Sequence, residues 1–318
     1  MEIAVNVNKT FLNDVATGLI STPKRIPSKY FYDEAGDKLF HYIMNQPEYY
    51  LTCAEHEILS TKAEDIFSNI DTSNGIRIIE PGAGDGFKTR LIIGHLLEKG
   101  FKVVYNPIDI SSNVLDILCR SIGEIYPQVL CQPMVSDFAH IEKIIVDDGI
   151  PKLMLFLGST IGNYSHQDAL SVLQKFSSVL TDGDFFLLGA DLVKDPKRIL
   201  DAYNDSNGYT ARFNYNLLER MNRELGAEFD VDNFIHYPVY NPLLQQAESY
   251  LVSKTEQDVY IEAAGCSYHF NAWEPIHTEI SRKYTFEVIA GLATAADFNV
   301  VENYTDMNRD FCCSLWKK

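Results

Sequence analysis

Three short segments combine residue types that can bind a small ligand containing a nucleoside. The first is the glycine-rich stretch EPGAGDG at residues 80–86, where the missing Cβ atoms let the backbone turn sharply and let a ligand approach the main chain. The second contains Asp109, whose carboxylate could accept hydrogen bonds from two ribose hydroxyls. The third contains Asp137, which could accept from an adenine amino group, and Phe138, whose ring could flank the base. Their order along the chain indicates a ligand with an adenosine moiety.

The glycine pattern separates two classes of such ligands. A loop that binds a nicotinamide dinucleotide reads G-x-G-x-x-G, and its third glycine packs the helix against the strand. Here Gly82 and Gly84 match the first two glycines, but Phe87 stands where the third would fall, which disfavours a nicotinamide oxidoreductase. S-adenosylmethionine has no pyrophosphate, and its carboxylate could pair with Lys88, which is otherwise a solvated helix charge. We therefore expect an S-adenosylmethionine site at this loop.

A second glycine-containing loop, FLGSTIGN at residues 156–163, follows an apolar strand. Ligands of open α/β sheets bind at the carboxyl ends of the strands, so this loop could face the transferable methyl group. In the alternative interpretation the loop is an ordinary turn and Asn163 caps the next helix. The residues alone leave both interpretations open.

The elements that must position these loops alternate between strand and helix. Apolar strands between helices are typical of a parallel sheet covered on both faces, so we expect an α/β, Rossmann-like domain. We predict strands at residues 75–80, 101–110, 129–135, 152–157 and 184–191, and helices at 88–99, 112–122 and 165–180. Residues 298–316 read as strand, turn and strand, which could add antiparallel edge strands to this sheet.

The rest of the chain has a different texture. We predict a helix at residues 40–59, one or two helices at 196–228, and strands at 234–240, 248–254, 258–263 and 281–286. We therefore expect a discontinuous α+β substrate-binding domain from residues 1–56 plus 194–282, and a cofactor-binding domain from residues 57–193 plus 283–318.

The composition of the chain indicates which classes of molecule it can bind. The 318 residues carry a formal net charge of −17, which argues against nucleic acid and against an anionic membrane surface as partners. A small zwitterionic or cationic substrate suits this charge better. The six cysteines include no C-x-x-C pair, so we expect reduced thiols and no metal. With no apolar signal segment and no run long enough to span a membrane, the expected location is the cytoplasm.

Several longer motifs resemble one known family, the histidine-specific, S-adenosylmethionine-dependent methyltransferases. A member of that family makes N-α-trimethylhistidine (hercynine) in ergothioneine biosynthesis. The motifs follow the family's order from about residue 20 to the C-terminus. They are TPK at residues 22–24, KYFYD at 29–33, PEYY at 47–50, FLGSTIGN at 156–163, DLVKD at 191–195, NRELGA at 222–227 and TEIS at 278–281.

The resemblance implies a role for each matched position. Tyr32 would lie between the cofactor and the substrate amine and would be the catalytic residue. The implied cofactor-binding residues are Tyr32, Gly82, Gly84, Lys88, Asp109, Asp137 and Phe138. The implied substrate-binding residues are Tyr49, Gly158, Asn163 and Tyr203 for the amino and carboxylate ends of L-histidine, and Ser249, Glu279 and Ser281 for the imidazole ring. Glu279 and Ser281 alternate on a predicted strand, so both side chains would face the same side.

The chain also departs from the family. Pro81, Asp85 and Phe87 stand in the glycine loop where the family has small or polar residues, and Ser249 replaces a methionine that often lies beside the imidazole. Methylation of a ring nitrogen, or of another amino acid, therefore stays an alternative to methylation of the α-amino nitrogen. A module that binds S-adenosylmethionine without catalysis is an alternative of another class. We expect a monomer whose partner is a small amino-acid substrate, L-histidine.

Overall fold

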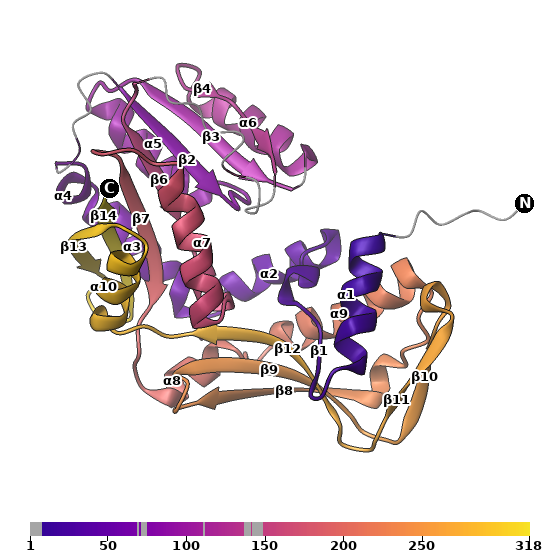
Figure 1. Ribbon diagram of the computed structural model, residues 1–318. Coiled ribbons are helices and arrows are strands. Elements are labelled where there is room, and N and C mark those ends of the chain that lie inside the picture. The colour runs from indigo at the N-terminus through magenta and orange to yellow at the C-terminus, as the bar shows by residue number, and fades with distance from the viewer. Residues whose placement is uncertain (1–7, 69, 71–74, 111, 137–140, 142–148) are drawn as a thin grey trace, which may run out of the picture. The chain divides into compact units, whose positions relative to one another are not determined.

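The computed structural model describes residues 8–68, 70, 75–110, 112–136, 141 and 149–318 (Figure 1). The chain forms two compact units. Unit 1 contains the residues up to Tyr50 and Lys194–Arg282, and unit 2 contains Leu51–Val193 and Lys283–Lys318. The sequence placed the first boundary at residue 57. Unit 2 begins earlier because helix α3 (Tyr50–Thr61) belongs to it, where Glu55 accepts a hydrogen bond from the Gly158 N–H.

Unit 2 is built on a sheet that is parallel except for two strands at one edge. The strand order is β13-β14-β7-β6-β2-β3-β4, and β5 also pairs with β3. Strands β2, β3, β6 and β7 are parallel, whereas β14 is antiparallel to both β7 and β13. This confirms the Rossmann-like fold and the two antiparallel strands near the C-terminus. The strands are β2 (Ile76–Pro81), β3 (Val103–Asp109), β4 (Leu130–Cys131), β5 (Met134–Val135), β6 (Lys152–Phe156), β7 (Phe185–Asp191), β13 (Asn299–Thr305) and β14 (Phe311–Lys317).

Helices pack on this sheet and close its core. Every residue of β6 and of β7 is buried, as expected for strands covered on both faces. One core cluster joins β6, β7 and β14 to α7 (His166–Ser178) and α10 (Phe286–Ala295), and it includes the fully buried Trp316. Ser165 caps α7, since its hydroxyl accepts from the Asp168 N–H. The remaining helices of the unit are α4 (Ala63–Ser68), α5 (Phe87–Glu98), α6 (Ser112–Ile125), η3 (Thr160–Asn163), α7 (His166–Ser178) and α10 (Phe286–Ala295).

Unit 1 is an α+β unit with its own sheet, in the order β1-β12-β9-β8, and a separate β10-β11 hairpin. Its strands are β1 (Lys24–Arg25), β8 (Phe234–Asn241), β9 (Gln246–Ser253), β10 (Gln257–Ile261), β11 (Cys266–Phe270) and β12 (Pro275–Arg282). Its helices are α1 (Lys9–Ile20), η1 (Ser28–Phe31), α2 (Glu34–Met44), α8 (Pro196–Ala202), α9 (Tyr209–Leu225), η4 (Val231–Asn233) and η5 (Glu262–Ala264). The long helix α9 buries an apolar stripe, which includes Phe213, Leu217 and Met221, against this sheet.

Two strand predictions for unit 1 are wrong. The strand expected at residues 281–286 lies earlier, as β12, and the prediction omitted β11. The chain leaves β12 because Tyr284 donates its N–H to the Asp191 carbonyl in unit 2, and Thr285 then caps α10. These tertiary and capping bonds outweigh the strand propensity of the aromatic residues there.

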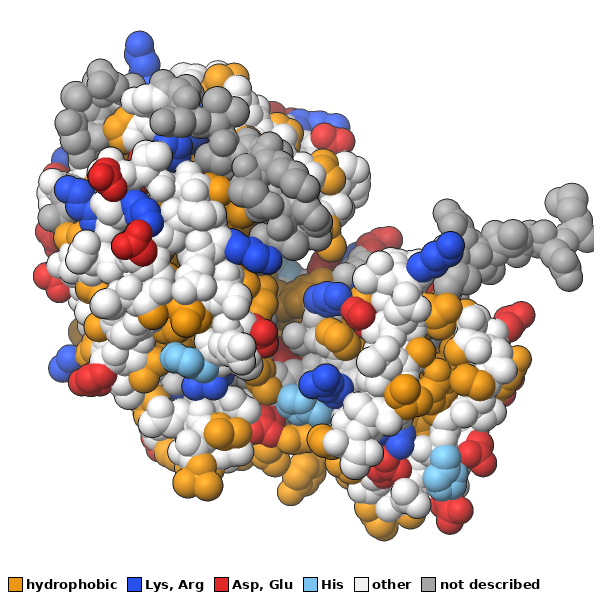
Figure 2. All heavy atoms as spheres, viewed as in Figure 1, with side chains coloured by type: hydrophobic (Ala, Val, Ile, Leu, Met, Phe, Trp, Pro, Cys, Tyr) orange, Lys and Arg blue, Asp and Glu red, His pale blue; other side chains and the backbone are white. Residues whose placement is uncertain are grey.

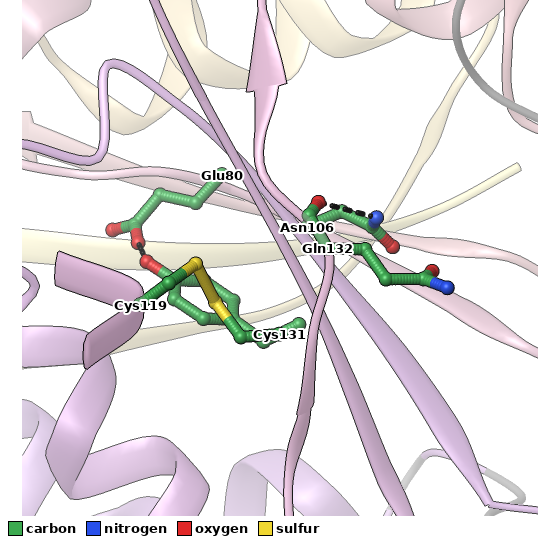
Figure 3. Close-up of a disulfide and its surroundings, with 6 residues drawn as sticks. Glu80, Asn106, Cys119, Cys131 and Gln132 are labelled. Atoms are coloured by element: carbon green, nitrogen blue, oxygen red, sulfur yellow. Dashed lines mark hydrogen bonds between the residues drawn. A yellow bond between two sulfur atoms is a disulfide. The ribbon is translucent and has the colours of Figure 1, made fainter. Parts of the chain in front are cut away.

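The expectation of reduced thiols is also wrong for one pair. Cys119 of α6 and Cys131 of β4 form a disulfide, with their Cα atoms 5.7 Å apart. Figure 3 shows it close to Glu80. The bridge forms because α6 packs beside β4, which brings the two cysteines together although they do not belong to a C-x-x-C motif.

Candidate functional site

The glycine loop leads from β2 into α5 and is attached to the neighbouring strand. The Gly82 N–H donates to the Ile108 carbonyl at 2.8 Å, and Gly82, Gly84 and Gly86 all have left-handed φ values of 53–71°. Among the described residues, no heavy atom lies within 4 Å of the position that a Cβ would take at Gly84, so this part of the structure leaves the main chain open there. This is the exposed backbone that a closely approaching ligand needs.

Asp109 lies where the prediction placed it, at the end of the strand next to the glycine loop. It is the last residue of β3, is half-buried, and its carbonyl accepts from the Ser136 N–H at 3.0 Å. Because β2 and β3 are parallel neighbours, the loop and this acid follow adjacent strands at the same edge of the sheet. Asp137 and Phe138 lie outside the described residues.

Lys88 and Gly158 meet at a residue that the sequence did not suggest. The Lys88 ammonium pairs with the carboxylate of Glu55, whose side chain is fully buried. The same carboxylate accepts from the Gly158 N–H, at 2.8 and 3.0 Å to its two oxygens. Lys88 is therefore not a solvated helix charge.

The turn after β6 is fixed by several hydrogen bonds. Gly158 and Ser159 both have left-handed φ values, and the buried Ser159 hydroxyl accepts from the Asp191 N–H at 3.1 Å. Asn163 ends η3 and is half-buried. The interpretation of Asn163 as the cap of the following helix is wrong, because Ser165 caps α7.

In unit 1, four of the predicted residues form two pairs. The Tyr203 hydroxyl donates to the Ser281 Oγ at 2.6 Å, and both side chains are buried. Ser249 of β9 faces Glu279 of β12 in the strand register, and its hydroxyl donates to the Glu279 carboxylate at 3.4 Å. The structure thus brings together Tyr203, Ser249, Glu279 and Ser281 on β9, β12 and the end of α8.

Tyr32 lies within a group of aromatic rings in the same unit. Its ring makes edge contacts with Phe40 at 5.6 Å and Phe213 at 5.5 Å between centroids, and Phe40 in turn contacts Tyr49 at 6.1 Å. The Arg220 guanidinium holds the backbone by donating to the Tyr32 carbonyl. Desolvation raises the pKa of the Tyr32 phenol, and the carboxylate of Glu279 raises it further. Tyr32 is therefore a neutral phenol at physiological pH.

Comparison with known proteins agrees with this geometry. The family model described as histidine-specific methyltransferase, SAM-dependent, matches residues 11–318. The chain belongs to this family. It is 37% identical over 306 residues to the histidine N-alpha-methyltransferase of Mycobacterium tuberculosis, which covers 96% of this chain and 94% of that protein. The corresponding protein of Mycolicibacterium smegmatis is 36% identical over 303 residues, with 95% and 93% covered. Ergothioneine biosynthesis protein 1 of Neurospora crassa is 33% identical over 217 residues, with 64% of this chain and 23% of that protein covered.

Membership of the family makes the chain an S-adenosylmethionine-dependent methyltransferase. Sequence reasoning missed Glu55, Phe40 and Phe213, which contact the predicted residues. A signal for Glu55 was present, because it lies at helical spacing from Leu51 and Ile58 and so falls on the apolar face of α3. Phe40 and Phe213 carried no comparable signal, since a buried aromatic residue on a helix is usually part of the core.

Other features of the methyltransferase lie away from these residues. A surface cavity of about 710 Å³ in unit 2 is lined by α3, α4 and β13 and contains none of the predicted site residues. Across the described ranges, no helix is long and apolar enough to cross a membrane, and no group of three or more His, Cys, Asp or Glu side chains could hold a metal ion. Figure 2 shows Lys and Arg side chains scattered among acidic and uncharged ones on the face it presents.

Proposed function

We propose that this methyltransferase transfers methyl groups to the α-amino nitrogen of L-histidine, up to the trimethylated product hercynine, in ergothioneine biosynthesis. The observation that carries the proposal is the full-length similarity to two proteins named for histidine N-α-methylation. The pairing of Glu279 with Ser249 and of Tyr203 with Ser281 supports it, because these are the positions that the family resemblance assigns to the substrate.

The residues of unit 2 fit the family's cofactor. S-adenosylmethionine supplies a methyl group that its sulfonium has already activated, so the protein has to orient and desolvate the reactants. Gly84 offers a close approach to its backbone, the strand-end carboxylate of Asp109 offers an acceptor for hydroxyls, and the partly exposed side chain of Lys88 offers a donor for a carboxylate. We propose that Gly82, Gly84, Lys88 and Asp109 hold the cofactor, together with Asp137 and Phe138.

Recognition of the imidazole ring is proposed to depend on Glu279. The half-buried carboxylate of Glu279 can accept a hydrogen bond from a ring N–H, and an amino acid without that donor would lack this bond to a charged group, which contributes about 1.5–3 kcal/mol. Ser249 adds a hydroxyl beside this carboxylate. We assign Tyr49, Gly158 and Asn163, with Tyr203, to the amino and carboxylate ends of the substrate.

The amino group must lose a proton before it can attack, because an ammonium has no lone pair. The raised pKa of Tyr32 means that this phenol keeps its own proton and does not act as a phenolate base. We therefore propose that Tyr32 orients the amine through its neutral hydroxyl and that water accepts the proton. Edge contacts of the Tyr32 ring with Phe40 and Phe213 support this position of the phenol. Holding the amine in line with the methyl donor can lower the barrier by up to about 7–11 kcal/mol.

The test is incubation of the purified protein with S-adenosylmethionine and L-histidine, followed by mass spectrometry of the product. The expected product carries up to three methyl groups and loses trimethylamine on fragmentation, because all three sit on the α-nitrogen. A fragment that keeps a methyl group on the imidazole would instead support ring methylation. Binding of the cofactor with no product from any amino acid would support a non-catalytic module. The cytoplasmic location, the monomeric state and the absence of nucleic-acid and membrane partners stay predictions.

A further inference from the structure

Helix α3 directs a carboxylate into the interior of unit 2. Glu55 is fully buried and shares the inner face of the helix with Leu51, Ile58 and Leu59. Burying a charge costs free energy unless the charge is paired and hydrogen-bonded, so the partners of Glu55 must offset the cost of its burial.

Those partners adjoin two loops, one assigned to the cofactor and one to the substrate. Lys88, in the first turn of α5 after the glycine loop, supplies an ammonium, and Gly158, in the turn after β6, supplies its N–H. The two are close to one another as well, because a Cβ at Gly158 would lie 3.3 Å from the Lys88 Nζ. Glu55 therefore joins both loops at one buried point.

The sheet leaves space for this carboxylate. A Cβ added to Gly189 of β7 would lie 2.2 Å from a Glu55 oxygen and 3.3 Å from the Gly158 nitrogen. Any larger residue at position 189 would displace Glu55 or the turn. Glycine at this position therefore leaves room for the Glu55 carboxylate in a fully buried strand, although glycine weakens strands in general.

We propose that Glu55 is a positioning residue that sets the charge of the cofactor site. It holds the Lys88 ammonium beside the Gly158 turn and cancels its charge, so that the site accepts a cofactor carrying a positive sulfonium. The Lys88 side chain keeps 20% of its surface exposed, so it can still donate to a ligand, whereas Glu55 is closed off and acts only through its neighbours. The inference rests on the family's cofactor and on the proposed contact of Lys88 with it, and not on which nitrogen is methylated.

A purely structural ion pair is the competing explanation. Buried pairs are often replaceable by apolar residues of similar volume, and their loss affects stability alone. The two explanations differ for S-adenosylmethionine, which is a sulfonium cation, and S-adenosylhomocysteine, which is a neutral thioether with the same amino acid and adenosine. A structural role would change the affinity for both ligands equally, whereas a change in site charge would affect the cation more.

The experiment uses three variants of the full chain: Glu55→Gln, Lys88→Met and the double variant. Glutamine removes the charge but keeps an oxygen that accepts from the Gly158 N–H, and methionine removes the ammonium but keeps most of the side-chain length. Isothermal titration calorimetry measures the Kd of each ligand, and the ligand-free melting temperature reports folding. Glu57→Gln, on the same helix, is the matched control, because its amide oxygen can still accept from the Met307 N–H.

The quantity to follow is the Kd of S-adenosylmethionine divided by that of S-adenosylhomocysteine. Glu55→Gln leaves Lys88 uncompensated and should raise this ratio about tenfold, a typical effect of one nearby charge on another. Lys88→Met leaves Glu55 uncompensated and should lower the ratio. The double variant restores neutrality and should return the ratio to that of the native protein, and Glu57→Gln should not alter it. For Glu55→Gln, the KM for S-adenosylmethionine should rise with little change in kcat.

A ratio that is the same in all three variants would overturn the proposal and leave a structural ion pair. If Glu55→Gln does not fold, Lys88→Met and the double variant can be compared instead. These two proteins differ only in the charge at position 55, so a difference in their Kd ratios for the two ligands reports the effect of that charge. The ligands bind without histidine, so a failed histidine assay does not affect this result. A native protein that binds neither ligand would contradict the cofactor assignment itself.

Discussion

Glu80, the first residue of the glycine-rich stretch, is a buried acid whose charge should control the stability of unit 2. It is 6% exposed, and its carboxylate accepts from the Thr89 hydroxyl at 2.6 Å and from the Tyr105 hydroxyl at 2.5 Å. Burial raises the pKa of Glu80 to about 7, although the two hydrogen bonds and the Lys88 charge oppose the increase. The carboxyl is therefore partly protonated near neutral pH.

The consequence for stability has a definite sign. In the unfolded chain the carboxyl ionises near pH 4.5, whereas the folded protein keeps the proton until about pH 7. Between these values the unfolded state binds fewer protons than the folded state, so the contribution of Glu80 to stability falls as the pH rises. The contribution is fully present below pH 4.5. The loss is complete above pH 7 and amounts to about 3 kcal/mol for a shift of this size.

The perturbation is Glu80→Gln, which cannot ionise but retains hydrogen-bonding capacity towards Thr89 and Tyr105. As the pH rises from about 5 to about 8, the free energy of unfolding of the variant should increase by about 3 kcal/mol relative to that of the native protein. Urea unfolding followed by tryptophan fluorescence measures this, because Trp316 is fully buried in unit 2 while Trp273 of unit 1 is already 66% exposed. All other titrating groups are common to both proteins and cancel in the difference.

The matched control is Glu98→Gln at the exposed end of α5, which should show no pH-dependent gain. A difference between Glu80→Gln and the native protein that stays constant over this pH range would refute the reasoning. It would mean that Glu80 has the same pKa in the folded and unfolded chain, and that the two hydroxyl donors fully offset its burial.

Three further predictions concern other parts of the molecule. Glu279→Gln should lower kcat/KM for histidine about ten- to a hundredfold, since a hydrogen bond to a charged group contributes about 1.5–3 kcal/mol. Glu248→Gln, on the opposite face of the sheet, is the control. If Glu279→Gln left the preference for histidine over other amino acids unchanged, Glu279 would not recognise the imidazole ring. Tyr32→Phe should slow turnover at saturating histidine, and an unaltered kcat would exclude the hydroxyl from the reaction. Reducing the disulfide that joins Cys119 and Cys131, which are 12 positions apart, should lower the free energy of unfolding by about 3 kcal/mol, as should the double serine variant; an unfolding midpoint insensitive to dithiothreitol would argue against the bridge.

The sequence predicted the parallel sheet well because its signals are local. The apolar runs that predict β6 and β7 each depend on a few neighbouring residues. The strand predicted at residues 281–286 was wrong because the structure of this segment depends on contacts with residues that are distant in the sequence. Tyr284 bonds to Asp191, and no local pattern in the sequence encodes that contact.

The candidate site was predictable only where a residue type is unusual for its position. The acid at the end of β3 and the glycines after β2 met that condition. The pairing of Ser249 with Glu279 did not, because it depends on the register of β9 against β12, which shifts at an irregularity between His277 and Glu279. The disulfide was missed for the same reason, since only the packing of α6 beside β4 brings its cysteines together.

The order of the strands in unit 2 has a consequence for the biosynthesis of the protein. β7 pairs on one side with β6, but its other neighbour, β14, is translated only after all of unit 1, and Phe311 then pairs with Asp191. All of unit 1 has therefore been synthesised while one edge of the apolar strand β7 is still unpaired. Such edges recruit other strands, and nascent chains that expose them are natural clients of chaperones. Unit 1 can finish folding first although the central strands of unit 2 are made earlier, so the rate of translation past residue 282 should influence the yield of active enzyme.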